Sequence, residues 1–183
     1  MPTYRRNFVP GGTYFFTVVT HRREPFLTTP LARSCLRLAM EEEGAARPFE
    51  QVAVVLLPDH LHAIWTLPHG DVRYPTRWKR IKERFTDAYL EGGGREGERT
   101  ASMRKRGERG IWQRRFWEHT VRDEDDLERC MNYVHWNPVK HGLVSRTADY
   151  EWSSFRRWVK NGEYDEHWGA GEIPEDVPGA EWE

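Results

Sequence analysis

The sequence predicts an α+β protein with a ferredoxin-like sandwich, in which helices cover one face of an antiparallel sheet. Three observations favour this fold class. The 183 residues are close to the usual size of one domain. Hydrophobic residues make up 38% of the chain and aromatic residues 13%, which excludes intrinsic disorder over most of its length. Segments typical of strands and helices come in the order strand, helix, strand, strand, helix, strand, and a further helix follows.

The first strand and the first helix are indicated by their composition and by end signals. Residues 12–21 are β-branched and aromatic after a Gly-Gly turn, as in a buried strand. Thr29 is expected to cap a helix that has Pro30 at its first position and apolar residues along one face. Gly44 is expected to end this helix.

A predicted β-hairpin carries the first candidate site residues. Residues 50–57 and 60–67 are typical of buried strands, and Pro58 with the following aspartate predicts the turn between them. His60 and His62 project to the same side, because side chains alternate along a strand. Two imidazoles can hold one cation, but a metal site needs a third ligand. The alternative is that one histidine is a hydrogen-bonded core residue and the other is exposed.

Basic residues cluster in the next helix and in the loop after it. Residues 75–90 predict a helix with an apolar inner face and a basic outer face. Residues 92–110 hold six glycines among many charges, which predicts a basic loop that is mobile without a ligand. Between residues 73 and 115 there are 14 basic and six acidic residues, as expected of a surface that binds a polyanion, although a solvated charged face is the alternative.

The candidate ligands for DNA phosphates are the basic residues of this region. They are Arg77, Lys79, Arg80, Lys82, Arg84, Arg104, Lys105, Arg106, Arg114 and Arg115. Trp78, Trp112 and Trp117 are candidates for stacking on unpaired bases, although core packing is the more common role for most tryptophans of this chain.

The last strand and the last long helix are predicted from residues 114–136. A strand is expected within residues 114–122. Asp123, with Asp126 three residues later, resembles a helix cap and predicts a helix over residues 125–136.

Tyr133 and Asn137 form the second candidate pair. On a continuous helix they share one face, because they are four residues apart. Pro138 disfavours that continuity, so Asn137 alternatively caps a short second turn that ends at Gly142. In both geometries an amide oxygen lies about one turn from a phenol. Packing alone is the more common role of a lone tyrosine on a helix.

Five segments carry a resemblance to known families. HLHAIW, residues 60–65, resembles the His-hydrophobe-His signature of HUH endonucleases. The other four together resemble the REP-associated tyrosine transposases, a branch of the single-tyrosine transposases, and the match runs from about Tyr4 to Val159. These four segments are GGTYFFTVVTHRR (11–23), RRFWEHTVRDEDDL (114–127), YVHWNPVKHGLV (133–144) and WSSFRRW (152–158).

The resemblance implies both a site and a function. Tyr133 is expected to be the nucleophile, and His60, His62 and Asn137 are expected to bind a divalent metal. Nitrogen and oxygen ligands suit Mg²⁺ or Mn²⁺. The implied function is a metal-dependent endonuclease and strand transferase that acts on single-stranded DNA beside hairpin-forming palindromic repeats, as a monomer or a homodimer. Attack by Tyr133 on DNA gives a 5′-phosphotyrosine intermediate.

Two other functions remain open at this stage. One is a metal hydrolase that uses His60 and His62 to activate water, with Tyr133 only packed. The other is a catalytically silent protein that binds hairpin or repeat DNA. His119, His135 and His141 remain spare metal ligands, and His135 is expected to be structural because it points away from Tyr133 on a helix.

The expected domain spans residues 1–160. Residues 161–183 hold eight acidic residues and no Lys or Arg, which predicts a disordered acidic tail. The N-terminus does not resemble a signal peptide and no apolar run is long enough for a membrane span, so a cytoplasmic, nucleoid-associated protein without a membrane partner is expected. Cys35 and Cys130 are expected to be reduced and buried.

Overall fold

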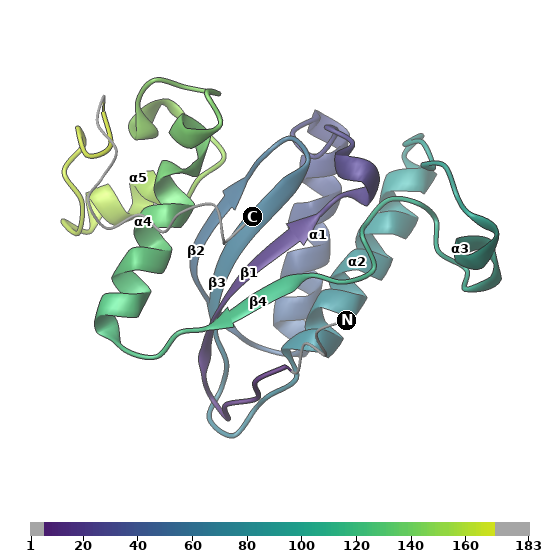
Figure 1. Ribbon diagram of the computed structural model, residues 1–183, viewed down its shortest axis with the longest axis horizontal. Helices are drawn as coiled ribbons and strands as arrows, with labels where there is room; N and C mark the ends of the chain where they lie inside the picture. The colour runs from purple at the N-terminus through teal and green to yellow at the C-terminus, as the bar shows by residue number, and fades with distance from the viewer. Residues whose placement is uncertain (1–5, 171–183) are drawn as a thin grey trace.

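A four-stranded antiparallel sheet forms the centre of the computed structural model, which describes residues 6–170. The strand order is β2-β3-β1-β4, and every pairing is antiparallel (Figure 1). The strands are β1 (Thr13–Val19), β2 (Glu50–Leu56), β3 (His60–Thr66) and β4 (Trp117–Thr120). This element order and sheet confirm the predicted ferredoxin-like α+β fold.

Helices cover both faces of this sheet. The helices α1 (Pro30–Ala46) and α2 (Tyr74–Glu91) pack on one face, and α4 (Glu124–Lys140) packs on the other (Figure 1). The shorter helices are α3 (Ala101–Lys105), α5 (Phe155–Lys160) and two 3₁₀ turns, His21–Arg23 and Thr147–Asp149. None of the described helices is both long enough and apolar enough to span a bilayer.

The alternation of side chains along β3 divides the core into two clusters. Leu61, Ala63 and Trp65 face α1 and α2, where the Trp65 ring stacks on Trp78 with centroids 4.2 Å apart. The opposite face carries Ile64, which packs with the apolar residues of α4. His62 shares that second face, so the sheet directs it toward α4.

The predicted helix starts are confirmed by their caps. The Thr29 hydroxyl accepts a hydrogen bond from the backbone N–H of Ala32 at 3.4 Å, and Pro30 is the first helical residue. The Asp123 carboxylate accepts from the backbone N–H of Asp126 at 2.8 Å. Both cysteines are free and buried, as expected.

Three expectations about element ends differ from the structure. The first helix runs past Gly44 to Ala46, because a glycine inside a helix is tolerated where its neighbours continue the hydrogen bonds. The segment 92–110 is not entirely loop, since Thr100 caps the helix α3 within it. Residues 161–170 are ordered against α4, where the Tyr164 hydroxyl donates to Asn132 Oδ1 at 2.7 Å. The rest of the expected acidic tail, residues 171–183, lies outside the described residues.

Candidate active site

The two histidines at the start of β3 are both buried. His60 is 2% exposed and His62 is 0% exposed, so the alternative of one buried and one exposed histidine is wrong. Antiparallel pairing sets Val19 opposite His60 and Thr17 opposite His62. The two imidazole centroids are 4.9 Å apart, which brings their nitrogens into one small region.

Each ring is oriented through its Nδ1 nitrogen. His60 Nδ1 lies 2.6 Å from the Asp59 carboxylate, and His62 Nδ1 lies 3.0 Å from the Thr17 hydroxyl. Such partners fix the tautomer and direction of a metal-binding histidine and leave Nε2 for the metal. Burial disfavours the charged Asp59 carboxylate, but hydrogen bonds from His60 and Arg23 outweigh it and lower the pKa of Asp59 to about 2.

His62 is held in its neutral form. Burial lowers the pKa of His62 well below its usual range, and positive charge at His60, His141, Lys140 and Arg23 lowers it further. A neutral imidazole is the form that binds a metal. Its Nε2 atom is buried and has no hydrogen-bond partner within residues 6–170.

The helix α4 places Tyr133 against this histidine pair. The centroids of the Tyr133 and His62 rings are 5.2 Å apart, and Phe15 packs edge-on against the same phenol at 5.8 Å. The helix is continuous through Pro138 to Lys140, so Tyr133 and Asn137 share one face, as the first of the two geometries predicted.

Asn137 lies on α4 one turn beyond Tyr133 and is fully buried. One turn further on, the His141 ring lies 5.2 Å from that of His60. Asn137 therefore lies between Tyr133 and His141 on one side of the helix, and each of these two residues contacts a ring of the histidine pair. Both polar atoms of its amide lack a partner among the described residues. A buried amide without a partner costs about 1–3 kcal/mol, which a bound ligand would recover.

The donor set fits a divalent ion. Two imidazole nitrogens and one amide oxygen are ligands that Mn²⁺ or Mg²⁺ accepts while keeping other positions for phosphate and water. Among the described residues, the orphaned Nε2 of His62 and the orphaned Oδ1 of Asn137 are the atoms that such an ion would satisfy.

Lys140 was not anticipated from the sequence as a site residue. Its ammonium lies 3.4 Å from the Tyr133 hydroxyl and 4.8 Å from the centre of the ring. A cation at this distance stabilises negative charge on the phenolic oxygen. The signal was present, because Lys140 is seven residues after Tyr133 and so lies two turns along the same helical face.

A second group of possible ligands lies at the other end of α4. His119, Asp126 and Cys130 place one ligand atom each within 4.8 Å of one another. The Asp126 carboxylate already accepts hydrogen bonds from His119 at 2.9 Å and from the Arg122 guanidinium at 3.0 Å. An arginine in this position supplies the positive charge that a metal would bring, so this group does not fit a cation site.

His135 has a structural role, in agreement with its predicted direction. It is 0% exposed, and its Nε2 lies 3.0 Å from the Ser154 hydroxyl. Burial lowers the pKa of His135 to about 3, so the ring is neutral. It packs against Phe155 and Tyr164 rather than toward Tyr133.

Arg77 is a correction to the expected basic surface. It is 1% exposed, because its guanidinium pairs with the Asp71 carboxylate at 2.9 Å and donates to the carbonyl oxygens of Arg47 and Pro48. Through these contacts Arg77 joins α2 to the segment that follows α1. It is therefore not available to DNA phosphates.

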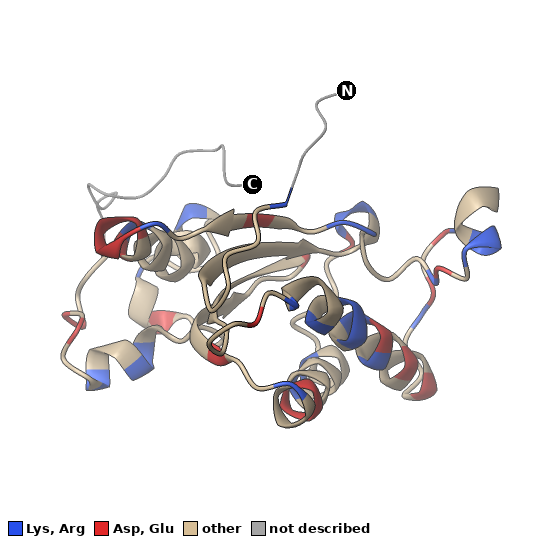
Figure 2. Cartoon of the chain, turned by 90° about the horizontal axis from the view of Figure 1, so that it is seen from below, with Lys and Arg blue, Asp and Glu red and all other residues tan. Residues whose placement is uncertain are grey.

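The other candidate phosphate ligands lie nearer to solvent. Figure 2 shows Lys and Arg along α2 and near α3, interleaved with acidic residues. Arg84 is half-buried and pairs with Glu42 and Glu43, and Lys82 is also half-buried. The exposed members are Lys79, Arg80, Arg104, Lys105, Arg106, Arg114 and Arg115.

Comparison with known proteins places this arrangement in a family. No family model matches the sequence. The chain is 41% identical over 174 residues to the REP-associated tyrosine transposase of Escherichia coli (strain K12), which covers 94% of this chain and 93% of that protein. A relative from Haemophilus influenzae that bears the same family name is 42% identical over 169 residues, or 92% of this chain and 94% of that one.

A solved structure gives the same result in three dimensions. It is described as a REP-associated tyrosine transposase bound to a REP hairpin, and it superposes on this chain with a TM-score of 0.76 at 40% sequence identity. The match covers 96% of this chain and 94% of the other. The chain belongs to the REP-associated tyrosine transposase family.

Proposed function

We propose that the chain is a metal-dependent endonuclease and strand transferase that acts on single-stranded DNA beside hairpin-forming, REP-type palindromic repeats. The observation that carries this proposal is the convergence of Tyr133, His60 and His62 at one buried point. The fold brings Tyr133 of α4 against the histidine pair of β3, which supports its assignment as the nucleophile. The family match supports DNA as the substrate, because a relative of similar structure is described as bound to a REP hairpin.

Tyr133 is proposed to attack the scissile phosphodiester. Its deprotonated phenolic oxygen forms a bond to phosphorus, the bond to the 3′ oxygen breaks, and that oxygen takes up a proton. The product is a 5′-phosphotyrosine and a free 3′-hydroxyl, and reversal of the same step rejoins the DNA. The Lys140 ammonium beside the Tyr133 hydroxyl favours the phenoxide that attacks.

His60, His62 and Asn137 are proposed to hold the divalent ion. When bound, Mg²⁺ or Mn²⁺ supplies positive charge to the non-bridging oxygens of the phosphate. The chain's own contribution is orientation: Asp59 and Thr17 fix the two imidazoles, and burial keeps His62 neutral. Tyr133 is 0% exposed and is covered by Lys140, so the approach of an anionic phosphate must draw the lysine aside.

The exposed basic residues of α2 and of the segment around α3 are proposed to bind the DNA backbone. They are Lys79, Arg80, Arg104, Lys105, Arg106, Arg114 and Arg115, with half-buried Lys82 and Arg84 at the edge of the same surface. Affinity through such contacts falls as salt rises. We assign residues 1–160 to one transposase domain, which the acidic segment 161–183 follows in the sequence.

Trapping of the covalent intermediate tests the proposal. The full chain is incubated with Mn²⁺ and a labelled DNA hairpin that has single-stranded flanks, and a denaturing gel detects the protein–DNA adduct. Tyr133→Phe should abolish the adduct. The matched control is Tyr150→Phe, which removes another buried phenol that donates to the Leu56 carbonyl at 2.7 Å and should leave the adduct intact.

The metal ligands are tested separately. His62→Ala should abolish both adduct formation and Mn²⁺ binding measured by electron paramagnetic resonance, with hairpin affinity retained. If Tyr133→Phe still cleaves DNA, the chain is a metal hydrolase instead. If the wild-type chain binds the hairpin but neither cleaves it nor forms an adduct, the chain is a silent DNA-binding protein.

A further inference from the structure

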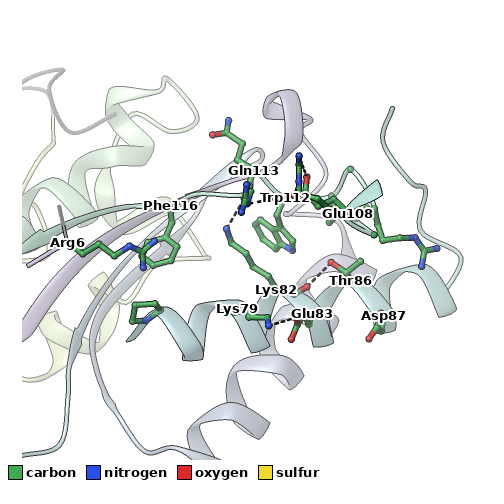
Figure 3. Close-up of a pocket in the computed structure, with 17 residues that line it drawn as sticks. Arg6, Lys79, Lys82, Glu83, Thr86, Asp87, Glu108, Trp112, Gln113 and Phe116 are labelled. Carbon is green, nitrogen blue, oxygen red and sulfur yellow. Dashed lines mark hydrogen bonds and ion pairs between the residues drawn. The ribbon is translucent and has the colours of Figure 1, made fainter. Parts of the chain in front are cut away.

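A second cavity lies away from the histidine pair, between α2 and the segment 106–116 that leads into β4 (Figure 3). Its volume is about 550 Å³, within the range of sites for small molecules. The α2 residues Lys82 and Thr86 form one wall, and Trp112, Gln113 and Phe116 form the other. None of these residues takes part in the proposed bond-breaking step, although Lys82 is among the residues proposed to bind the DNA backbone.

An ammonium group stands between two aromatic rings in this cavity. Lys82 Nζ donates to the Gln113 carbonyl at 2.9 Å and lies 6.0 Å and 5.6 Å from the ring centres of Trp112 and Phe116. Burial, and then the positive charge of Arg6, lowers the pKa of Lys82 to about 8. A lysine in this setting gains from an incoming anion, because the anion restores its preference for the charged form.

The Trp112 ring has an unused hydrogen-bond donor. Its indole N–H is buried and lacks a partner within the described part of the chain. Four other buried indole N–H groups of the described residues also lack an acceptor, but Trp112 is the one of these five tryptophans that lines the cavity. A ligand that combines a flat ring with acceptor atoms would both contact Trp112 and satisfy this donor.

The cavity is anchored to the end of β1 that also holds the histidine site. Gln113 N–H donates to the Val19 carbonyl at 2.9 Å, and Trp112 forms a β-bridge with Thr20. Val19 is the residue opposite His60 in the sheet. The backbones of Trp112 and His60 are thus about two strand spacings, or roughly 10 Å, apart across the sheet.

The charges that line the cavity favour an anion. Six basic residues and three acidic residues contribute to it. Glu83 pairs with Lys79 at 3.7 Å and Glu108 pairs with Arg106 at 2.6 Å, whereas the acceptor of the Lys82 ammonium within residues 6–170 is a neutral carbonyl. A flat ring and a negative charge in one ligand are the features of a nucleotide.

We propose that this cavity binds one unpaired nucleotide of single-stranded DNA, with its base against Trp112 and its phosphate at Lys82. The proposal rests on the proposed function for the identity of the ligand as DNA. The cavity then holds a nucleotide near the cleavage site without taking part in the chemistry. Because base stacking on an aromatic ring tolerates every base, the cavity selects for an unpaired nucleotide rather than for one sequence.

Binding of the full chain to two DNA hairpins, in EDTA to prevent cleavage, tests the proposal. One labelled hairpin carries a single-stranded extension and the other is blunt, and fluorescence anisotropy gives each Kd. Trp112→Leu should weaken binding of the extended hairpin by roughly tenfold or more and leave the blunt hairpin unchanged. Lys82→Met, which also removes a backbone contact, should weaken binding of the extended hairpin by roughly tenfold more than binding of the blunt one. The matched controls, Trp168→Leu and Lys160→Met, alter residues at the other end of the molecule and should change neither Kd.

An abasic series locates the nucleotide. Replacing the bases of the extension one at a time should weaken wild-type binding at one position, and that effect should vanish in Trp112→Leu. Equal losses of affinity for both hairpins, or an abasic effect that survives in Trp112→Leu, overturn the proposal. If Trp112→Leu fails to fold, the decision rests on Lys82→Met, with Lys82→Arg as the variant that should restore binding. Loss of the covalent adduct in the cleavage assay does not affect this test, so the two proposals fail independently.

Discussion

The two ends of α4 bury polar side chains in opposite ways. At the N-terminal end, Asp126 is 1% exposed and its carboxylate accepts hydrogen bonds from His119 and from the backbone and side chain of Arg122. At the C-terminal end, Asn137 is 0% exposed and neither atom of its amide has a partner in the described part of the chain. One helix therefore carries a satisfied polar cluster and an unsatisfied one.

This difference between the two polar clusters indicates which of them stabilises the fold and which is a candidate binding site. A buried polar group that is fully hydrogen-bonded stabilises one conformation, whereas a buried group without partners costs free energy. Such a cost persists at positions where a ligand recovers it. Asn137 lies on the helical stripe that contains Tyr133, and His62 faces that stripe with its own orphaned Nε2. The polar cluster at Asp126 is therefore assigned to stability, and the cluster at Asn137 to the proposed metal site.

Removal of Asp126 should give the largest effect. Asp126→Ala leaves the backbone N–H of Arg122 and the side chain of His119 without their acceptor, so the free energy of unfolding should fall by about 3 kcal/mol. Chemical denaturation measures this loss. Asp125→Ala, which removes an exposed acid of the same helical turn, should cost less than about 1 kcal/mol. Equal losses in the two variants would contradict the assignment of Asp126 as a stabilising residue.

The same cluster should make stability depend on pH in acid. Burial disfavours the Asp126 carboxylate, but hydrogen bonds from Arg122 and His119 outweigh it and lower the pKa of Asp126 to about 2. An unfolded aspartate has a pKa near about 3.9, so the contribution is complete above about pH 5 and is lost as pH falls toward about 2. The loss should be about 2 kcal/mol. Denaturation curves between pH 5 and pH 2 should be flatter for Asp126→Asn, and an unchanged slope would exclude this origin.

The sequence allowed the fold to be predicted because its signals are local. Runs of β-branched and apolar residues, helix caps at Thr29 and Asp123 and the strand–helix order all depend on neighbouring residues. The end of the first helix was misplaced at Gly44, because whether a glycine ends a helix depends on contacts that are remote in sequence. The buried position of Arg77 was missed for the same reason, since its partner carbonyls come from the end of α1.

The candidate site was predictable in its residue types and only partly in its geometry. The alternation of a strand places His60 and His62 on one side, and helical spacing places Asn137 beside Tyr133. The sequence does not reveal that α4 crosses the face of the sheet to which these histidines point. The hydrogen bond between Thr17 and His62 also depends on the strand register, which only the pairing of β1 with β3 fixes.

Lys82, on α2, is intermediate between the satisfied carboxylate of Asp126 and the unsatisfied amide of Asn137. Its ammonium donates to one carbonyl, that of Gln113. With its pKa lowered to about 8, Lys82 is charged below that pH and neutral above it, so binding of a phosphate above pH 8 requires uptake of a proton. The Kd of the extended hairpin should rise roughly tenfold between pH 8.5 and pH 9.5 and change little below pH 7. The other charged groups that line the cavity are Arg6, Lys79, Glu83, Asp87, Arg106, Glu108, Arg109 and Arg114.

Lys82→Arg provides the control for this pH dependence. An arginine stays charged throughout the range, so the Kd of this variant should not vary between pH 7 and pH 9.5. A rise in Kd of the same size in both proteins would mean that another group titrates, and Lys82 would then not contact the phosphate.

The smallest expected effect compares two asparagines of α4 directly. Asn132 Oδ1 accepts a hydrogen bond from Tyr164, so Asn132→Ala should lower the free energy of unfolding by about 1 kcal/mol. Asn137→Ala removes an amide whose two polar atoms have no partner among the described residues, and should leave the metal-free stability unchanged or raise it by about 1 kcal/mol. In the presence of Mn²⁺ the stability advantage of Asn137→Ala should shrink or reverse, because the wild-type chain and Asn132→Ala gain stability from the ion and Asn137→Ala gains less. If Asn137→Ala loses as much metal-free stability as Asn132→Ala, then Asn137 is an ordinary structural residue, and the contrast between the two ends of the helix does not mark the site.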